Sequence, residues 1–189
     1  MHRAAGAGVA LRLWAARHAA TDAEGLCVGQ HDVATFLSAQ LAADAIREQV
    51  VNIPDVVHSS PLSRCAEPAA LLAAAWGRPH RVDARLLEIH YGEWQGRAWT
   101  DIERDDAERF ADFMQHWLTA APPGGEALRS IEARVRTWRA ELEPGDHLLV
   151  AHAGVVRALR VLTSGVSWPT AMREAVPHIQ LELLTRSPS

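Results

Sequence analysis

Short apolar runs alternate with amphipathic stretches along this chain. The apolar runs lie at 8–14, 55–60 and 147–151, and each is followed by polar residues. Runs of this length are typical of buried strands. Between them, apolar residues recur three and four positions apart, which predicts amphipathic helices. The alternation of strands and helices predicts an α/β fold.

The helical pattern is clearest after the first predicted strand. Five apolar residues fall there on one face of a helix over about 33–50: Phe36, Leu37, Leu41, Ala45 and Ile46. Further helices are predicted over about 61–76, over 99–118 and from residue 126 onward. Because proline disrupts a helix interior, we expect Pro68 to kink the second helix or to delay its start.

Weaker signals complete the outline of the fold. A short strand is predicted at 80–85, a structured loop at 87–96 and an edge strand at 181–184. Pro122-Pro123-Gly124-Gly125 predicts a turn. Since the chain has no internal repeat or low-complexity linker, we expect one domain over residues 1–189. A helical insertion at about 98–120 is expected to pack over the site.

Composition narrows the class of protein. The 189 residues are 48% hydrophobic and 22% charged, and the net charge of −4 argues against general binding to nucleic acid. No apolar run approaches the roughly 18 residues of a membrane span, and no secretory or transit signal is recognised, so a cytoplasmic protein without membrane contact is expected. Cys27 and Cys65 are the only cysteines, and two free thiols are expected.

The chain contains no lysine, and all 19 basic residues are arginine. A Walker-type phosphate loop and a lysine Schiff base are therefore excluded. Neither cysteine is followed six positions later by arginine, and no D-x-D pair occurs, which argues against the familiar thiol and aspartyl phosphatases. No cofactor and no metal ion are predicted.

Ionisable residues follow each predicted strand. Arg17 and His18 follow the first strand, Arg64 lies just beyond the second, and His152 follows the third. Ligands of open α/β sheets bind at the carboxyl ends of the strands. We therefore expect these side chains to meet at one edge of the sheet, together with Glu88 from a glycine-containing loop.

This set of groups suits phosphoryl transfer through a histidine. A neutral imidazole nitrogen of His18 can attack phosphorus. The guanidinium groups of Arg17 and Arg64 would grip phosphoryl oxygens. His152 and the backbone N–H groups at the start of the helix after it, from Ala153, would add donors and a favourable dipole.

Glu88 would carry the acid and base chemistry. As the neutral acid it would protonate the leaving oxygen, and as the carboxylate it would activate the water that cleaves the phosphohistidine. The expected ligand is a small phosphorylated molecule.

Five motifs carry a resemblance to a known superfamily. In chain order they are Arg17-His18-x-x-Thr21, Ser59-Ser60-Pro61-Leu62-x-Arg64, Leu87-Glu88-x-x-Tyr91-Gly92-x-Trp94-x-Gly96, Pro122-Pro123-Gly124-Gly125-Glu126 and His152-x-Gly154-Val155-x-Arg157-Ala158-Leu159. Together they resemble the motifs of the histidine phosphatase (phosphoglycerate mutase-like) superfamily.

The resemblance implies a three-layer α/β/α sandwich around a mostly parallel sheet. It also implies a metal-independent phosphomonoester hydrolase or mutase with a phosphohistidine intermediate. It supports His18, Glu88 and His152 as catalytic residues, and it adds Thr21 to the phosphate-binding set. The chain is most similar to α-ribazole phosphatase-like members, which implies α-ribazole 5'-phosphate as a substrate in cobalamin biosynthesis.

Two departures from the family pattern bear on activity. Ala19 stands where glycine is usual, and Pro68 could shift the helix that carries Arg64. They motivate a second hypothesis, a protein that binds phosphorylated ligands but turns over slowly. A phosphoglycerate mutase-type phosphotransferase is a further alternative.

The same side chains also allow a metal site. His18, His152 and Glu88 could form a two-histidine, one-carboxylate site, although the flanking arginines would repel a cation. The remaining histidines of note, His58, His90 and His178, are expected at the surface or on the rim. The sequence does not predict an oligomeric state.

Overall fold

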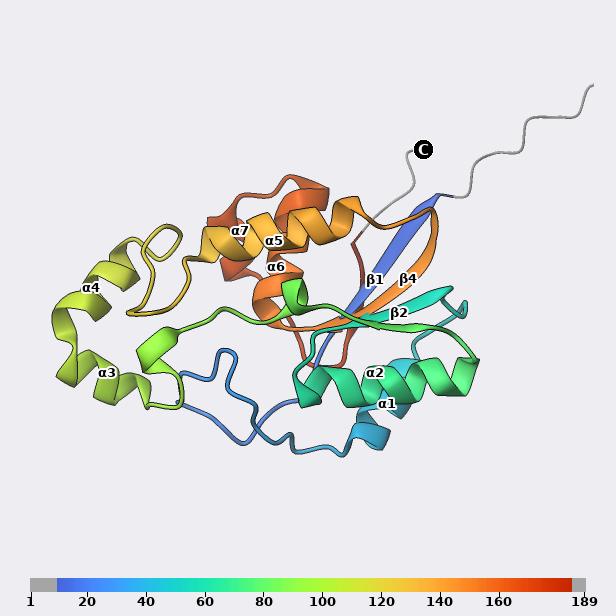
Figure 1. The fold of residues 1–189 in the computed structure, drawn as a ribbon, viewed down its shortest axis with the longest axis horizontal. Coiled ribbons are helices and arrows are strands. Elements are labelled where there is room, and N and C mark those ends of the chain that lie inside the picture. Colours follow the sequence, from blue (N-terminus) through green and yellow to red (C-terminus); the bar gives the residue numbers. More distant parts are fainter. Residues whose placement is uncertain (1–9, 185–189) are drawn as a thin grey trace, which may run out of the picture.

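A five-stranded sheet forms the centre of the molecule, which is described over residues 10–184 by a computed structural model (Figure 1). The strands are β1 (Leu11–Arg17), β2 (Val56–Ser59), β3 (His80–Val82), β4 (Gly145–Ala151) and β5 (Leu181–Leu183). Their spatial order is β3-β2-β4-β1-β5. All neighbours are parallel except β5, which runs antiparallel to β1 at one edge. The predicted mostly parallel α/β sheet is confirmed.

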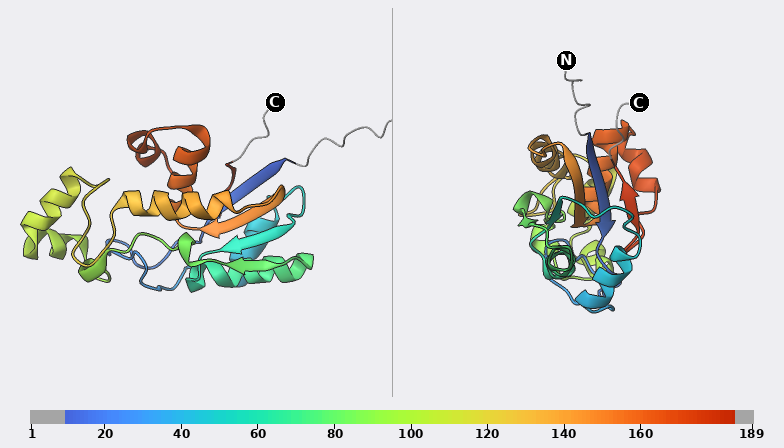
Figure 2. Two further views of the ribbon diagram at one scale, coloured as in Figure 1. Left: turned by 45° about the horizontal axis from the view of Figure 1, so that its top comes forward. Right: turned by 90° about the vertical axis from the view of Figure 1, so that its right-hand side faces the viewer.

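Helices cover both faces of this sheet (Figures 1 and 2). One face packs against α1 (Ala39–Arg47) and α2 (Ser63–Trp76). The other packs against α5 (Leu128–Ala140), α6 (Ala153–Ser164) and α7 (Trp168–Arg173). The remaining elements are α3 (Trp99–Asp105), α4 (Ala107–Gln115) and the short 3₁₀ helices η1 (Ala84–Leu86) and η2 (Gly92–Trp94). This is the expected three-layer sandwich.

Strand β4 shows how the two cores arise. Leu148 and Val150 belong to the core shared with α1 and α2, whereas Leu149 and Ala151 belong to the core shared with α5 and α6. Successive side chains of a strand point to opposite faces, so an unbroken apolar run feeds both cores. The apolar run 147–151 therefore lies at the centre of the sheet.

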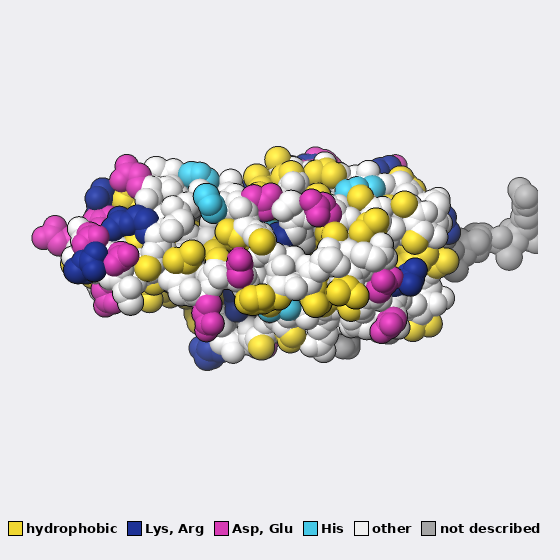
Figure 3. All heavy atoms as spheres, turned by 90° about the horizontal axis from the view of Figure 1, so that it is seen from below, with side chains coloured by type: hydrophobic (Ala, Val, Ile, Leu, Met, Phe, Trp, Pro, Cys, Tyr) yellow, Lys and Arg dark blue, Asp and Glu magenta, His cyan; other side chains and the backbone are white. Residues whose placement is uncertain are grey.

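The helices α3 and α4 lie beyond one end of the sheet (Figure 1). They enclose a third, small core made by Cys27, Trp94, Ile102 and Phe113. Charged side chains of both signs gather on the outside of this end (Figure 3), where Arg97 pairs with Asp105 and Arg104 with Asp101. Exposed pairs of this kind contribute little stability each.

The single helix predicted over 99–118 is wrong. The chain breaks at Asp106, whose φ of −137° and ψ of 41° are not helical. Its Oδ2 accepts a hydrogen bond from Trp94 Nε1 at 2.8 Å, which ties the break to the small aromatic core. The two shorter helices can therefore wrap around that core.

The helix predicted over about 33–50 is shorter than expected. Its N-cap is Ser38, whose hydroxyl accepts from Leu41 N, and residues before it form a loop in which Thr35 pairs with Thr21. Phe36 and Leu41, which were expected on a buried face, are 72% and 57% exposed. The serine cap competes with continued helix, which is a common use of serine.

Pro68 does not delay its helix. Helix α2 begins at Ser63 and continues through Pro68 to Trp76. The missing N–H removes one bond, to the carbonyl of Arg64, near the start of the helix, and the helix survives because its apolar side packs on the sheet. The predicted delay is wrong.

Gly8 and Val9, the beginning of the first predicted strand, lie outside the described residues. Helix α7 was not predicted, although Ser167 caps it and Pro169 stands in its first turn, which is a recognisable start signal. Within residues 10–184, no helix is long and apolar enough to cross a membrane.

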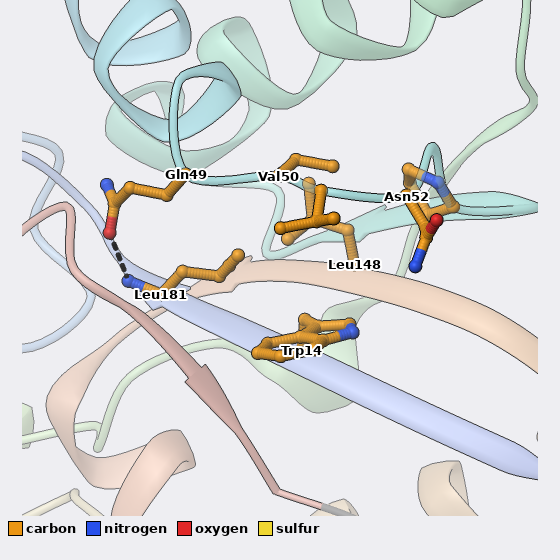
Figure 4. A pocket seen from close by; sticks show the side chains of 8 residues that line it. Trp14, Gln49, Val50, Asn52, Leu148 and Leu181 are labelled. Atoms are coloured by element: carbon orange, nitrogen blue, oxygen red, sulfur yellow. Dashed lines mark hydrogen bonds between the residues drawn. The ribbon is translucent and has the colours of Figure 1, made fainter.

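A small crevice of about 40 Å³ lies beside the antiparallel edge, between Trp14, Leu148 and Leu181 (Figure 4). Gln49 borders it, and its Oε1 accepts from Leu181 N at 3.0 Å while its Nε2 donates to Ile179 O at 2.8 Å. The crevice is too small for an organic phosphate. Its hydrogen bonds fasten β5 to the end of α1.

Candidate active site

A cavity of about 540 Å³ opens at the carboxyl ends of β1, β2 and β4. The predicted site residues that line it are Arg17, His18, Thr21, Arg64, Glu88 and Ala153. Pairing of Arg17 with Ala151, and of Ser59 with Val150, aligns the three strand ends in register. The structure thus brings together side chains that are up to 136 residues apart in the sequence.

His18 is held with one ring nitrogen available. Its Nδ1 lies 2.7 Å from the carbonyl oxygen of Ala19, and since a carbonyl only accepts, Nδ1 must carry the proton. Burial lowers the pKa of His18 to about 3, and the nearby Arg64 and Arg17 add to this. At neutral pH the ring is therefore neutral, with the lone pair on Nε2.

Arg17 and Arg64 are each anchored by backbone oxygens and each keep an unused donor. Arg17 donates to Val176 O at 3.0 Å, and Arg64 donates to Gly29 O and His31 O, both at 2.8 Å. The Nε atoms of both are buried without a hydrogen-bond partner. Both side chains line the cavity, and a guanidinium group has further N–H donors that could bind an anionic ligand there.

His152 lies behind His18 and does not line the cavity. It is fully buried, its ring centroid is 5.2 Å from that of His18, and the two rings meet edge to face. Burial, followed by the charge of Arg64, holds the pKa of His152 well below its usual value. Cys65 Sγ lies 3.6 Å from His152 Nε2, and both cysteines are free thiols, as expected.

Glu88 reaches the cavity from the loop that follows η1. Its Oε2 accepts from Gly154 N at 3.2 Å, and its Oε1 accepts from Ile89 N at 3.1 Å. A Cβ on Gly154 would lie only 2.2 Å from Glu88 Oε1. The glycine at the start of α6 therefore makes room for this carboxylate.

Arg134 of α5 braces the loop that carries Glu88. It donates to the backbone oxygens of Glu88 at 3.1 Å and of Arg85 at 2.6 Å, and it pairs with Glu126 at 2.9 Å. Glu126 in turn accepts from His90 N at 3.0 Å. Sequence reasoning did not select Arg134, because its importance depends on contacts across the fold.

Two other residues join the site. Arg157 lines the cavity and donates to Ala171 O at 3.1 Å, and it stands four positions after Ala153, so both lie on one face of α6. The four-residue spacing from Ala153 is the signal in the sequence that points to Arg157 as a site residue. His178 lies on the rim as expected, and its Nδ1 donates to His18 O at 2.7 Å.

The prediction for His58 is wrong, because this residue is 3% exposed. Glu143 O accepts from His147 Nε2 at 2.9 Å, which leaves His147 Nδ1 to accept from His58 Nε2 at 3.0 Å. Burial lowers the pKa of His58 to about 3. This pair is part of the protein interior, away from the cavity.

The departures from the family motifs do not disturb the geometry. Ile179 is the only non-glycine residue within 10–184 with a positive φ, so Ala19 has an ordinary backbone conformation. Arg64 reaches the cavity although Pro68 follows it in α2. Ala19 also supplies the oxygen that orients His18.

The alternative of a metal site finds no support in the geometry. Across the described part of the chain, no group of three or more histidine, cysteine, aspartate or glutamate side chains could hold a metal ion. Three arginines, Arg17, Arg64 and Arg157, border the same cavity as His18 and Glu88. Their positive charge disfavours a cation at this place and favours an anion.

The chain belongs to the histidine phosphatase superfamily. The family model for branch 1 of this superfamily matches residues 13–188. The relatives described below are named as phosphatases, and the chain is a phosphoric monoester hydrolase of this superfamily. The resemblance seen in the five motifs is confirmed.

Among its relatives is the adenosylcobalamin/alpha-ribazole phosphatase of Escherichia coli (strain K12), 29% identical over 163 residues that cover 79% of this chain and 77% of that protein. The glucosyl-3-phosphoglycerate phosphatase of Mycobacterium tuberculosis (strain ATCC 25618 / H37Rv) is 35% identical over 119 residues, 56% of this chain and 52% of the relative. The crystal structure of the alpha-ribazole phosphatase from Shigella flexneri superposes with a TM-score of 0.81 at 26% identity, covering 92% of this chain and 89% of that one.

Proposed function

We propose that this phosphatase hydrolyses a small phosphomonoester in two steps through a phosphohistidine on His18. One observation carries the proposal. The neutral ring of His18, oriented by Ala19 O, opens onto a cavity that the side chains of Arg17 and Arg64 also line. A nucleophile and a pair of cationic donors are what a phosphoryl group requires.

In the first step, Nε2 of His18 attacks phosphorus and the bond from phosphorus to the alcohol oxygen breaks. Glu88 gives its proton to that oxygen as it leaves. Arg17, Arg64 and the backbone N–H of Ala153 hold the phosphoryl oxygens, with Thr21 at the edge. Since the ring gains positive charge on phosphorylation, the bond from Nδ1 to Ala19 O stabilises the intermediate.

His152 is proposed to donate an N–H to the transferred group. Its burial keeps the ring neutral, and the distance of 5.2 Å between the two ring centroids supports contact with a phosphoryl group held on His18. Phosphorylation of His18 would bring an oxygen against this ring. The contact would then be made in the intermediate and not by the free enzyme.

In the second step, water attacks the phosphorus of the phosphohistidine. Glu88, now a carboxylate, accepts the proton from water, and inorganic phosphate leaves as the lone pair returns to Nε2. The hydrogen bonds from Gly154 N and Ile89 N keep the carboxyl group of Glu88 in position through both steps. No other group needs to change its protonation state.

For the substrate we propose α-ribazole 5'-phosphate, in cobalamin biosynthesis. The names of the relatives from Escherichia coli and Shigella flexneri support this choice. Hydrolysis is favoured over mutase-type transfer, since these two relatives and the one from Mycobacterium tuberculosis are named phosphatases. We further propose that the protein acts in the cytoplasm.

The proposal is tested with substrate labelled in its phosphate. On mixing with α-ribazole 5'-[³²P]phosphate and rapid quenching, base-stable label should appear on the peptide that contains His18, and free phosphate should follow. His18→Ala should give neither product. His116→Ala, which replaces an exposed histidine of the α4 end, serves as the matched control and should behave as the unmodified protein.

Three results would contradict the proposal. Label on another residue would exclude His18 as the nucleophile. Label that stays on organic product would indicate a mutase. Free phosphate released at the normal rate by His18→Ala would indicate direct attack by water.

A further inference from the structure

A second cavity, of about 620 Å³, adjoins the phosphate cavity. The two share five wall residues: Ile89, Tyr91, Trp99, Leu128 and Met172. The other walls come from α4 and from the segments that follow it and begin α7: Phe110, Phe113, Met114, Trp117 and Pro169. We call this second cavity the aromatic chamber.

The chemistry of the aromatic chamber differs sharply from that of its neighbour. None of its lining residues carries a charge, and five of them are aromatic. The phosphate cavity, by contrast, is bordered by Arg17, Arg64, Arg157 and Glu88. A ligand that spans both must be anionic at one end and apolar at the other.

The aromatic walls are braced before any ligand arrives. The ring of Tyr91 meets that of Trp99 edge to face at 5.3 Å and that of Phe113 at 6.2 Å. Trp94 supports Phe113 from behind at 5.5 Å, and its Nε1 is anchored to Asp106. Such packing fixes the shape of the wall and reduces the entropy lost on binding.

The chamber also has an adaptable part. Met114 and Met172 line it and are 56% and 43% exposed. Methionine side chains adjust to ligands of different outline and make favourable contacts with aromatic rings. The chamber therefore combines a rigid aromatic wall with a flexible methionine edge.

We propose that the aromatic chamber binds the alcohol portion of the substrate and selects phosphate esters whose alcohol carries a flat aromatic or similarly apolar group. This inference rests on the proposed phosphatase function, since continuity with the phosphate cavity identifies the occupant as part of the same ligand. Esters of polyhydroxy or carboxylate-bearing alcohols would lose water from their polar groups against uncharged walls. They are the disfavoured substrates.

Phosphonates test the chamber without turnover. Binding of methylphosphonate and of 2-naphthylmethylphosphonate to the unmodified protein is measured by calorimetry. Burial of about 60 Å² of the naphthyl ring is enough for about tenfold tighter binding. We therefore expect 2-naphthylmethylphosphonate to bind at least about tenfold more tightly than methylphosphonate. Equal affinities for the two phosphonates would overturn the proposal.

Met114→Asp tests the location. Met114 lines the chamber but not the phosphate cavity, and its exposure allows a charged replacement without unfolding. We call the ratio of the affinity for 2-naphthylmethylphosphonate to that for methylphosphonate the naphthyl advantage. It should fall at least about fivefold, because entry of the ring would remove water from a carboxylate at the chamber edge. Affinity for methylphosphonate should stay within twofold.

Leu41→Asp is the matched control. Leu41 is 57% exposed on α1 and lines neither cavity, so neither affinity should change. A naphthyl advantage that survives Met114→Asp would refute the chamber as its source. So would a dimer that dissociates in Met114→Asp, because the apolar walls would then serve contact between two copies of the chain.

The phosphonate experiment separates this inference from the proposed function. If methylphosphonate binds but gains nothing from a naphthyl group, only the chamber proposal fails. If neither phosphonate binds, the phosphate site itself is refuted, and the chamber proposal falls with it. Tight naphthyl binding in a protein that releases no phosphate would support the chamber while contradicting the hydrolytic mechanism.

Discussion

Replacement of Gly154 by alanine should remove the acid chemistry while leaving the fold intact. The added Cβ would lie 2.2 Å from Glu88 Oε1, whereas Glu88 Cδ and Ile131 Cδ1 lie at 3.3 Å, a tight contact that a shift of a few tenths of an ångström relieves. The end of the Glu88 side chain is therefore the group that must move. Gly154 lies within α6, where alanine is favoured over glycine by up to about 1 kcal/mol, so thermal stability should not fall.

The expected loss of rate follows from how far the carboxylate of Glu88 must move. To reach a normal contact, the carboxylate must shift by about 1 Å, and a misplacement of that size can reduce a rate about 10²-fold. General acid catalysis contributes about 10²–10⁴-fold, which sets the upper limit. We therefore expect phosphoenzyme formation from an alkyl phosphate to slow by about 10²-fold or more.

The assay compares two leaving groups by rapid mixing. An alkyl alkoxide needs a proton to leave, whereas p-nitrophenolate leaves without one. In Gly154→Ala, the burst of p-nitrophenol should be nearly normal, while phosphoenzyme formation from the alkyl ester should be slow. Since Glu88 also activates water, a slow steady state should follow the burst, so the comparison must be made on the first turnover.

Glu88→Gln provides the reference, because it removes the transferable proton but keeps the shape of the side chain. The double variant with Gly154→Ala should be no worse than Glu88→Gln alone, since both changes act on one group. Equal burst-phase losses for the two leaving groups would refute the reasoning. Glu88 would then only position the phosphate, and His90 would be the next candidate for the proton donor.

Other perturbations have equally defined outcomes. Arg64→Ala should reduce turnover about 10²-fold or more, as removal of one preorganised donor does, and a loss under about threefold would refute its role in the phosphate site. Arg134→Met should slow turnover of alkyl esters more than of p-nitrophenyl phosphate, because it releases the loop that carries Glu88; equal losses would contradict this. The folded pKa of His58, about 3, lies below its unfolded value of about 6.5, so its contribution to stability is complete above that value and is lost as pH falls toward 3. Urea unfolding should show that the free energy of unfolding decreases from pH 7 to pH 5, and that this decrease is smaller in His58→Asn. An equal decrease in the variant and the unmodified protein would contradict the prediction.

The sequence alone determined the layout of the site. Apolar runs ending in Arg17-His18 and His152 predicted parallel strands whose carboxyl ends converge, because this is the only common way to bury such runs in an α/β fold. Charge and residue type then predicted a phosphate ligand, since arginine and neutral histidine suit it chemically. The lack of lysine excluded rival chemistries without any structure.

Local signals failed where another interaction competed with them. The periodicity around Phe36 predicted a helix, but Ser38 capped a shorter one and left that ring exposed at the cavity. Pro68 predicted a kink or a late helix start, but the helix begins before Pro68, because packing on the sheet outweighed one lost hydrogen bond. In both cases a local preference worth a few tenths to a few kcal/mol was outweighed, by the serine cap in the first helix and by packing on the sheet in the second.

Only the tertiary structure decided the environment of each catalytic group and the shape of the substrate site. Burial of His18 lowers its pKa to about 3, and the space beside Gly154 admits the carboxylate of Glu88; neither depends on residues adjacent in the chain. The aromatic chamber likewise forms only where α4, the loop after η1 and α7 meet. Residue types fix what chemistry is available, whereas distance, desolvation and cavity shape exist only once segments remote in sequence pack together.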